Sequence, residues 1–173
     1  RALFYGRIRA MCAEFQGVCH STMLHEEPFD FMRLGMLLER ANQTARVMDV
    51  KHHWLAGEVS NSTSETPREA AQWGALLRLC AAAEPFFKHA RGAPSGARVA
   101  EFLLKEPTFP RAVLHSLDRS RNFLSRIEHG TSRTTPCSAR KLVLSSVNRV
   151  KNRAIDEVLE VGLHQELTVI IDA

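Results

Sequence analysis

Four ionisable residues of one short segment have the types and spacing that could do chemistry. Glu39 and Arg40 are adjacent, and Arg46 and Asp49 follow within three helical turns. On a helix, Glu39 and Arg46 share a face, and Arg46 meets Asp49 at a spacing of three residues. Glu39 could act as a general base or hold a cation, while Arg40 or Arg46 could bind a carboxylate or a phosphate.

The segment that carries these residues is expected to be one helix over residues 27–56, because Glu27 and Pro28 suit a helix start and Gly57 suits an end. Its apolar residues fall on two faces. One stripe holds Phe31, Leu34, Leu38, Ala41, Ala45 and Met48; the other holds Met32, Met36, Val47 and Val50.

A helix that is apolar on two faces is normally central to a bundle. Glu39, Gln43 and Arg46 point toward the second stripe, so we expect them to be enclosed rather than to be ordinary surface residues. An enclosed carboxylate must be paired or must do chemistry. Two interpretations follow, a functional site and a buried ionic network that fixes the position of the helix.

A further candidate binding residue is Arg111, in the segment Phe109-Pro110-Arg111. We expect a helix to begin at Phe109, which would place Arg111 in its first turn, where the helix dipole disfavours a cation. An acidic partner, Glu39 or Asp49, would explain that position. The alternative is a surface arginine without a partner.

The histidines do not have the spacing of a metal site. His20 and His25 are five residues apart and His52 and His53 are consecutive, whereas two ligands on one helical face need a spacing of four. The other possible chemical role is a thiolate pair formed by Cys19 and His20. We expect capping and core-filling roles, with no metal and no cofactor.

The composition favours a cytoplasmic protein without a membrane segment. The four cysteines form no CxxC pair, as is usual for reduced thiols, and no apolar run is long enough to cross a bilayer. The charge is uneven: residues 111–153 carry ten basic and two acidic side chains, and residues 154–173 carry five acidic side chains and none that are basic. The basic segment either pairs with the acidic one, is solvated, or binds RNA, and the lack of interleaved aromatic residues argues against RNA.

Helical periodicity recurs along the whole chain, so we expect an all-α fold. The sequence predicts a single domain, residues 1–173, with six or seven helices in a bundle around the helix 27–56. The other predicted helices span 3–18, 67–91, 95–106, 109–129 and 138–171, the last with a break near Arg153 or at Gly162.

Several ordered motifs resemble the bacterial Alpha-E family. They include His20-Ser21-Thr22-Met23, the segment from Phe31 to Val50, Gln72-Trp73-Gly74-Ala75-Leu76-Leu77-Arg78, Phe109-Pro110-Arg111 and Ile155-Asp156-Glu157-Val158-Leu159. The family is named for its helical fold and a Glu-Arg dyad, which Glu39-Arg40 match. Its members are usually about twice as long, and this chain resembles their C-terminal half.

The resemblance implies a pathway in which the protein takes part, but it does not imply a particular reaction. Alpha-E proteins tend to be encoded or fused with ATP-grasp-type peptide ligases and with transglutaminase-like proteins. One hypothesis is an accessory module without turnover, in which Glu39, Arg46 and Asp49 form a structural or ligand-orienting network. The other is an enzyme, or half of one, that uses Glu39 as an acid or base in peptide or amide chemistry beside Arg40, Arg46 and Arg111. A missing half would expose core residues, and self-association is one way to cover them.

Overall fold

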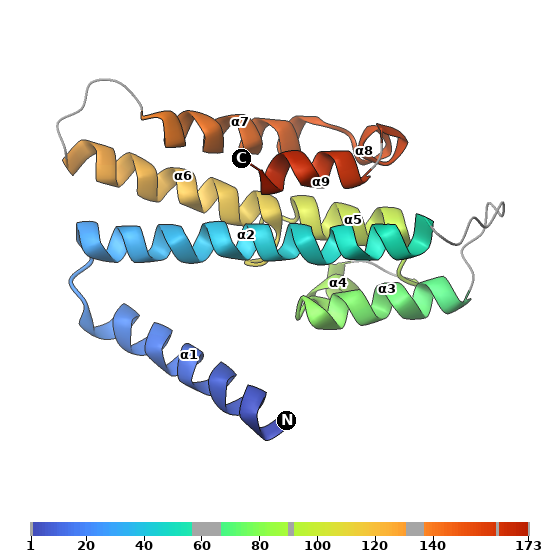
Figure 1. The fold of residues 1–173 in the computed structure, drawn as a ribbon, viewed down its shortest axis with the longest axis horizontal. Helices are drawn as coiled ribbons and strands as arrows, with labels where there is room; N and C mark the ends of the chain where they lie inside the picture. Colours follow the sequence, from blue (N-terminus) through green and yellow to red (C-terminus); the bar gives the residue numbers. More distant parts are fainter. Residues whose placement is uncertain (1, 57–66, 90–91, 131–136, 162, 173) are drawn as a thin grey trace.

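The computed structural model describes residues 2–56, 67–89, 92–130, 137–161 and 163–172 (Figure 1). These residues form α-helices and no strand, which confirms the all-α class. The helices are α1 (Ala2–Thr22), α2 (Glu27–Ala56), α3 (Pro67–Leu79), α4 (Ala83–His89), α5 (Gly96–Lys105), α6 (Val113–Gly130), α7 (Ser138–Asn152), α8 (Ile155–Val161) and α9 (Leu163–Ile171).

Helix α2 is the central element, as predicted, and it begins at the predicted residue, Glu27. It extends to Ala56, and Gly57, the predicted end, lies outside the described residues. It packs chiefly against α6 and α9, with smaller contacts to α3 and α5. Figure 1 shows α2 crossing the molecule between a layer that holds α6, α7 and α9 and the shorter helices α3 and α4. The buried apolar side chains of α2 are Phe29, Leu34, Leu37, Ala41, Ala45 and Met48.

The second apolar face of α2 is less enclosed than the sequence predicted. Met32, Met36 and Val47 are half-buried, and Val50 is exposed. The prediction that Glu39, Gln43 and Arg46 are enclosed is wrong, because all three are exposed. The physical reason is that the described helices cover the first apolar face of α2 closely and leave the second face, with Glu39, Gln43 and Arg46, partly open to solvent.

Helix α1 diverges from the rest of the molecule (Figure 1). Cys19 is its one buried residue among the described ones. The helix continues to Thr22 rather than ending at Val18, and the Met23 amide still donates to the Cys19 carbonyl at 3.1 Å in the helical pattern.

The predicted helix 67–91 is two helices, α3 and α4. They are separated at Ala81, whose φ of 51° lies in the left-handed region. Pro67 opens α3 as expected. Further on, Gly96 at the start of α5 lies so close to Trp73 of α3 that a Cβ atom there would be 2.9 Å from the indole ring. This glycine lets α5 approach α3.

Helix α6 begins at Val113, so the prediction of a helix start at Phe109 is wrong. The residues from Glu106 to Ala112 form a turn in which the Ala112 amide donates to the Phe109 carbonyl at 2.9 Å. This bond spans three residues, as in a turn, whereas the Ser116 amide donates across four residues to the Ala112 carbonyl at 3.0 Å, as in an α-helix. Arg111 therefore lies in this turn, and the helix-dipole argument does not apply to it.

The C-terminal segment is broken near Arg153, as predicted, where α7 ends at Asn152 and α8 begins at Ile155; α8 and α9 are bounded by Val161 and Leu163, and Gly162, the alternative place for a break, lies outside the described residues. These divisions of the segment and the break at Ala81 explain why the described chain has more helices than the six or seven expected. The polar segment Glu58–Thr66, with its predicted cap Thr66, and the connector 131–136 lie outside the described residues. No helix of the described residues is long and apolar enough to cross a membrane.

Candidate functional site

The two residues of the Glu-Arg dyad lie on different sides of α2. Glu39 is exposed, and among the described residues its hydrogen-bond partner is Gln43, whose Nε2 donates to Glu39 Oε1 at 2.8 Å. Arg40 is half-buried, and its Nη1 approaches the Pro110 carbonyl oxygen at 3.5 Å. Consecutive helical side chains diverge by about 100°, so one helix presents the two groups to different surroundings.

Glu39 lies at a cavity of about 390 Å³ between α2, α6, α7 and α9. The cavity wall is mostly apolar, and the polar groups on it include Glu39, Asn42 and Ser146. Its apolar lining includes Leu38, Leu117, Leu142, Val143, Ile170 and Ile171. A carboxylate at the edge of an apolar cavity could orient a ligand that carries one polar or cationic group.

Arg40 and Thr44 contact the turn that precedes α6. Thr44 is one helical turn from Arg40 and is buried, and its Oγ1 donates to the Arg111 carbonyl oxygen at 2.9 Å. The Arg40 contact with the adjacent Pro110 carbonyl is longer. The Thr44 bond is therefore the stronger of two links between α2 and this turn.

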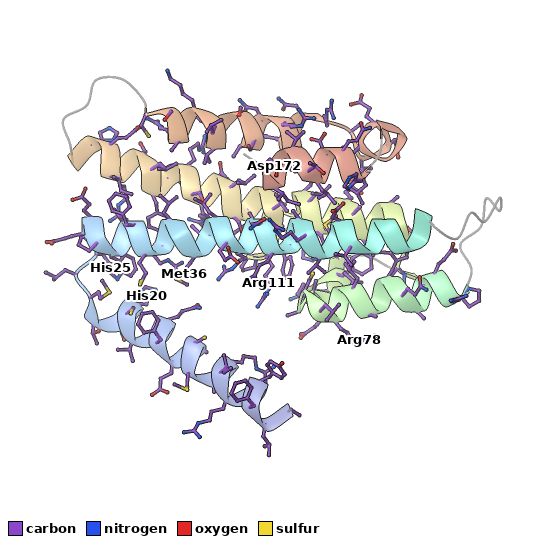
Figure 2. The ribbon with its side chains drawn as sticks, viewed as in Figure 1. His20, His25, Met36, Arg78, Arg111 and Asp172 are labelled. Atoms are coloured by element: carbon purple, nitrogen blue, oxygen red, sulfur yellow. The ribbon has the colours of Figure 1, made fainter. Side chains whose placement is uncertain are left out.

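Three arginines gather at this contact. Burial lowers the pKa of Arg40, and the positive charges of Arg111 and Arg33 lower it further. Figure 2 shows Arg111 and Met36 on the side of α2 that faces α1 and α3. Among the described residues, no acidic side chain forms an ion pair with Arg33, Arg40 or Arg111.

The expected pairing of Arg46 is wrong. Arg46 Nε donates to Asn42 Oδ1 at 3.0 Å, four residues earlier on α2, and neither Glu39 nor Asp49 is its partner in the described chain. Asp49 instead accepts a hydrogen bond from His164 Nδ1 at 2.6 Å. This bond links α2 to α9, and no local sequence pattern indicates it because the two residues are 115 positions apart.

The expected acidic partner of Arg111 is not found among the described residues. Glu39 is bonded to Gln43 and Asp49 to His164, while the Arg111 side chain is exposed. The alternative, a surface arginine, fits the described chain. Its backbone carbonyl, rather than its guanidinium, makes the contact with α2.

The histidines at the start of α2 have local structural roles. His25 stacks on Phe29 with ring centroids 4.0 Å apart, and its Nε2 donates to the His20 carbonyl oxygen at 2.9 Å (Figure 2). The side chains of His52 and His53 lie outside the described part. Within that part, no group of three His, Cys, Asp or Glu side chains is placed to hold a metal ion.

Sequence reasoning missed a buried carboxylate near the C-terminus. Glu166 on α9 is 2% exposed, and Arg149 of α7 donates to its two oxygens at 2.6 and 2.9 Å. Arg153 forms a second ion pair with the same carboxylate. The hydrogen bonds to Glu166 raise the pKa of Arg149. The charge asymmetry was the available signal, since it suggested that the basic segment pairs with the acidic one.

Two further buried carboxylates hold α6 in place. Glu128 accepts hydrogen bonds from the Cys137 amide at 2.6 Å and from Arg140 Nη1 at 2.8 Å, and these bonds join the end of α6 to the start of α7. Asp30 of α2 pairs with Arg126 of α6 at 3.0 Å. Both are packing contacts between helices rather than parts of a site.

A second cavity, of about 410 Å³, lies between α2 and α3. We call it the α2–α3 groove; it is lined by Arg46, Val47, Val50, Gln72, Ala75, Leu76 and Leu79. Leu79 is 75% exposed and Val50 is 57% exposed. Apolar side chains of this size in a solvent-facing groove are typical of an interaction surface.

Comparison with known proteins identifies the family of the chain but no individual related protein. No curated protein and no solved structure matches the chain. The Alpha-E family, described as "a predicted alpha-helical domain with a conserved ER motif", matches residues 1–173. Glu39-Arg40 on the central helix is the Glu-Arg step of this chain, and the described residues form the helical domain that the description requires. The chain therefore belongs to the Alpha-E family.

Proposed function

We propose that this chain is an accessory helical module of a peptide-ligation or peptide-modification system. In this proposal it docks onto an ATP-grasp-type ligase and has no turnover of its own. The observation that carries the proposal is the α2–α3 groove, because its exposed Leu79 and Val50 give a partner protein an apolar surface to cover. The family resemblance supplies the class of partner.

The surroundings of Glu39 support a module without turnover. Its hydrogen-bond partner in the described residues is the neutral amide of Gln43. A general acid or base is normally matched with a group that shifts its pKa or exchanges its proton. The neighbouring Arg40 faces the turn before α6 instead.

Binding of a purified ATP-grasp-type ligase tests the docking surface. Leu79→Lys should weaken the affinity at least tenfold in isothermal titration calorimetry, because it places a charge in the apolar groove. Leu142→Lys is the matched control, since Leu142 is also exposed but lines the cavity beside Glu39. Equal affinities for the wild type and Leu79→Lys would contradict docking in the groove. A transglutaminase-like protein, titrated in parallel, tests the other partner class.

An enzyme that uses Glu39 is the second candidate. One observation favours it: Glu39 lies at the rim of an apolar cavity of a size that fits a small molecule. Glu39→Gln, added to the reconstituted ligase system, separates the two. A purely structural role of Glu39 predicts unchanged product formation by folded protein, and loss of product with an unchanged melting temperature would contradict that role.

A further inference from the structure

Helix α1 carries a stripe of apolar side chains that the described molecule does not cover. The α1 stripe consists of Phe4, Ile8, Met11, Phe15 and Val18. Each of these side chains is between 43% and 64% exposed. Most of the stability of a helix in a protein comes from packing of its apolar face, so burial of the stripe would add to the stability of α1.

The spacing of the stripe specifies the kind of partner. The five residues follow one another at intervals of four, three, four and three positions, which is the heptad spacing of a coiled-coil seam. Such a seam packs its side chains between those of a second helix with the same spacing. The partner surface is therefore a helix that carries a heptad stripe.

The charges beside the stripe favour a second copy of α1 in the opposite direction. Arg7 and Glu14 lie one heptad apart on the same flank of the stripe, immediately before Ile8 and Phe15. In an antiparallel pair centred near Met11, Arg7 of each copy faces Glu14 of the other. In a parallel pair, Arg7 and Glu14 would instead face Cys12 and Cys19 of the other copy, and both charge pairs would be lost.

The exposed area is sufficient for such a pair. The stripe offers roughly 500 Å² of exposed side-chain surface on each copy, about 1,000 Å² for the pair, which reaches the lower limit of a specific interface. We propose that α1 is a homodimerisation helix, and that two copies of the chain associate through an antiparallel pair of α1 stripes.

Sedimentation velocity of the full chain across micromolar concentrations tests the association. The wild type should be a concentration-dependent dimer, and Ile8→Asp should be monomeric at every concentration tested. Because Ile8 is exposed and far from the core, the variant should keep the helical circular-dichroism signal and melting temperature of the bundle. A monomeric wild type, or a dimer that survives in Ile8→Asp, overturns the proposal.

Charge exchange tests the direction of the pair. Arg7→Glu alone and Glu14→Arg alone should each weaken the dimer about five- to twentyfold, since two attractive pairs become repulsive. The double variant Arg7→Glu/Glu14→Arg should restore wild-type affinity. Arg9→Glu is the matched control, because Arg9 lies on the opposite face of α1 and should leave the affinity unchanged. Additive rather than compensating effects of the two exchanges would overturn the antiparallel arrangement.

Discussion

Thr44 Oγ1 donates a hydrogen bond to the carbonyl oxygen of Arg111 across 2.9 Å, and this bond joins the central helix α2 to the turn before α6. The Thr44 side chain is buried, so the carbonyl oxygen has little access to water at this contact. The position is one helical turn beyond the Glu-Arg dyad. It makes the turn, rather than a ligand, the closest neighbour of this face of α2.

Thr44→Val should lower the free energy of unfolding by about 1–2 kcal/mol, because it keeps the shape of the side chain and leaves the Arg111 carbonyl without a donor. Urea denaturation measures the change. Thr168→Val is the control: the Thr168 hydroxyl bonds to His164 within α9, where the helix supplies its own backbone hydrogen bonds, and a smaller loss is expected. Equal losses of unfolding free energy in the two variants would show that the Thr44–Arg111 bond contributes no more to stability than a side-chain bond within a helix.

Arg149→Met should destabilise the chain by about 2–3 kcal/mol, because it leaves the buried Glu166 carboxylate without its bidentate partner. The remaining pair with Arg153 limits the loss. Arg121→Met removes the exposed pair with Asp118 and should change the free energy of unfolding by under about 0.5 kcal/mol. Guanidinium denaturation measures the free energy of unfolding of the two variants. Similar losses for both would contradict the expectation that the buried ion pair contributes more than the exposed one.

The stability of the fold should fall in acid through Glu128. Hydrogen bonds from Cys137, and then the bond and charge of Arg140, lower the pKa of Glu128 from 4.5 to about 2. A carboxylate whose pKa is lowered by folding stabilises the folded state above its unfolded-state pKa, and this contribution disappears as the pH falls toward the folded-state pKa. The loss should therefore occur between pH 4.5 and about 2.

Denaturation curves across that pH window check the Glu128 prediction. Glu128→Gln should be less stable than the wild type at neutral pH, and the difference should shrink as the pH falls from 4.5 toward about 2. Carbon-13 NMR titration of the Glu128 carboxyl group reads the same pKa directly. A carboxyl that titrates near 4.5 would contradict the hydrogen-bonded geometry.

Arg111→Gln should raise stability slightly at low salt, because it removes a positive charge that acts on the half-buried Arg40. Removing one like-charge interaction is worth roughly 0.2–0.5 kcal/mol, and salt screens it. The melting temperature should therefore rise in 20 mM salt by about 0.5–2 °C and stay unchanged in 1 M salt. Arg9→Gln, on exposed α1, should show no change at either concentration.

Local features of the fold could be predicted from the sequence because their causes lie within a few residues. The start of α2 followed from Glu27-Pro28. The helix predicted from residue 95 is α5, and the Ser95 side chain caps it by accepting a hydrogen bond from the Arg98 amide. The break in the C-terminal helix near Arg153 was also expected.

The surroundings of the candidate site could not be predicted in the same way. Periodicity shows that α2 has two apolar faces, but it does not show which neighbouring helix covers each of them. Glu39 and Arg46 are therefore exposed where enclosure was expected. Likewise, the partners of Asp49 and Glu166 come from other helices, and no local pattern points to them.

The contact between Asp49 and His164 has a consequence for how the chain folds during synthesis. The two residues are 115 positions apart, so α2 leaves the ribosome long before α9 can cover it. At a translation rate of about 5–20 residues per second, roughly 6–23 seconds pass between the synthesis of Asp49 and that of His164, and during this time α9 cannot cover the apolar stripe of α2. Throughout that interval the nascent chain offers the same surface to chaperones that the finished bundle hides.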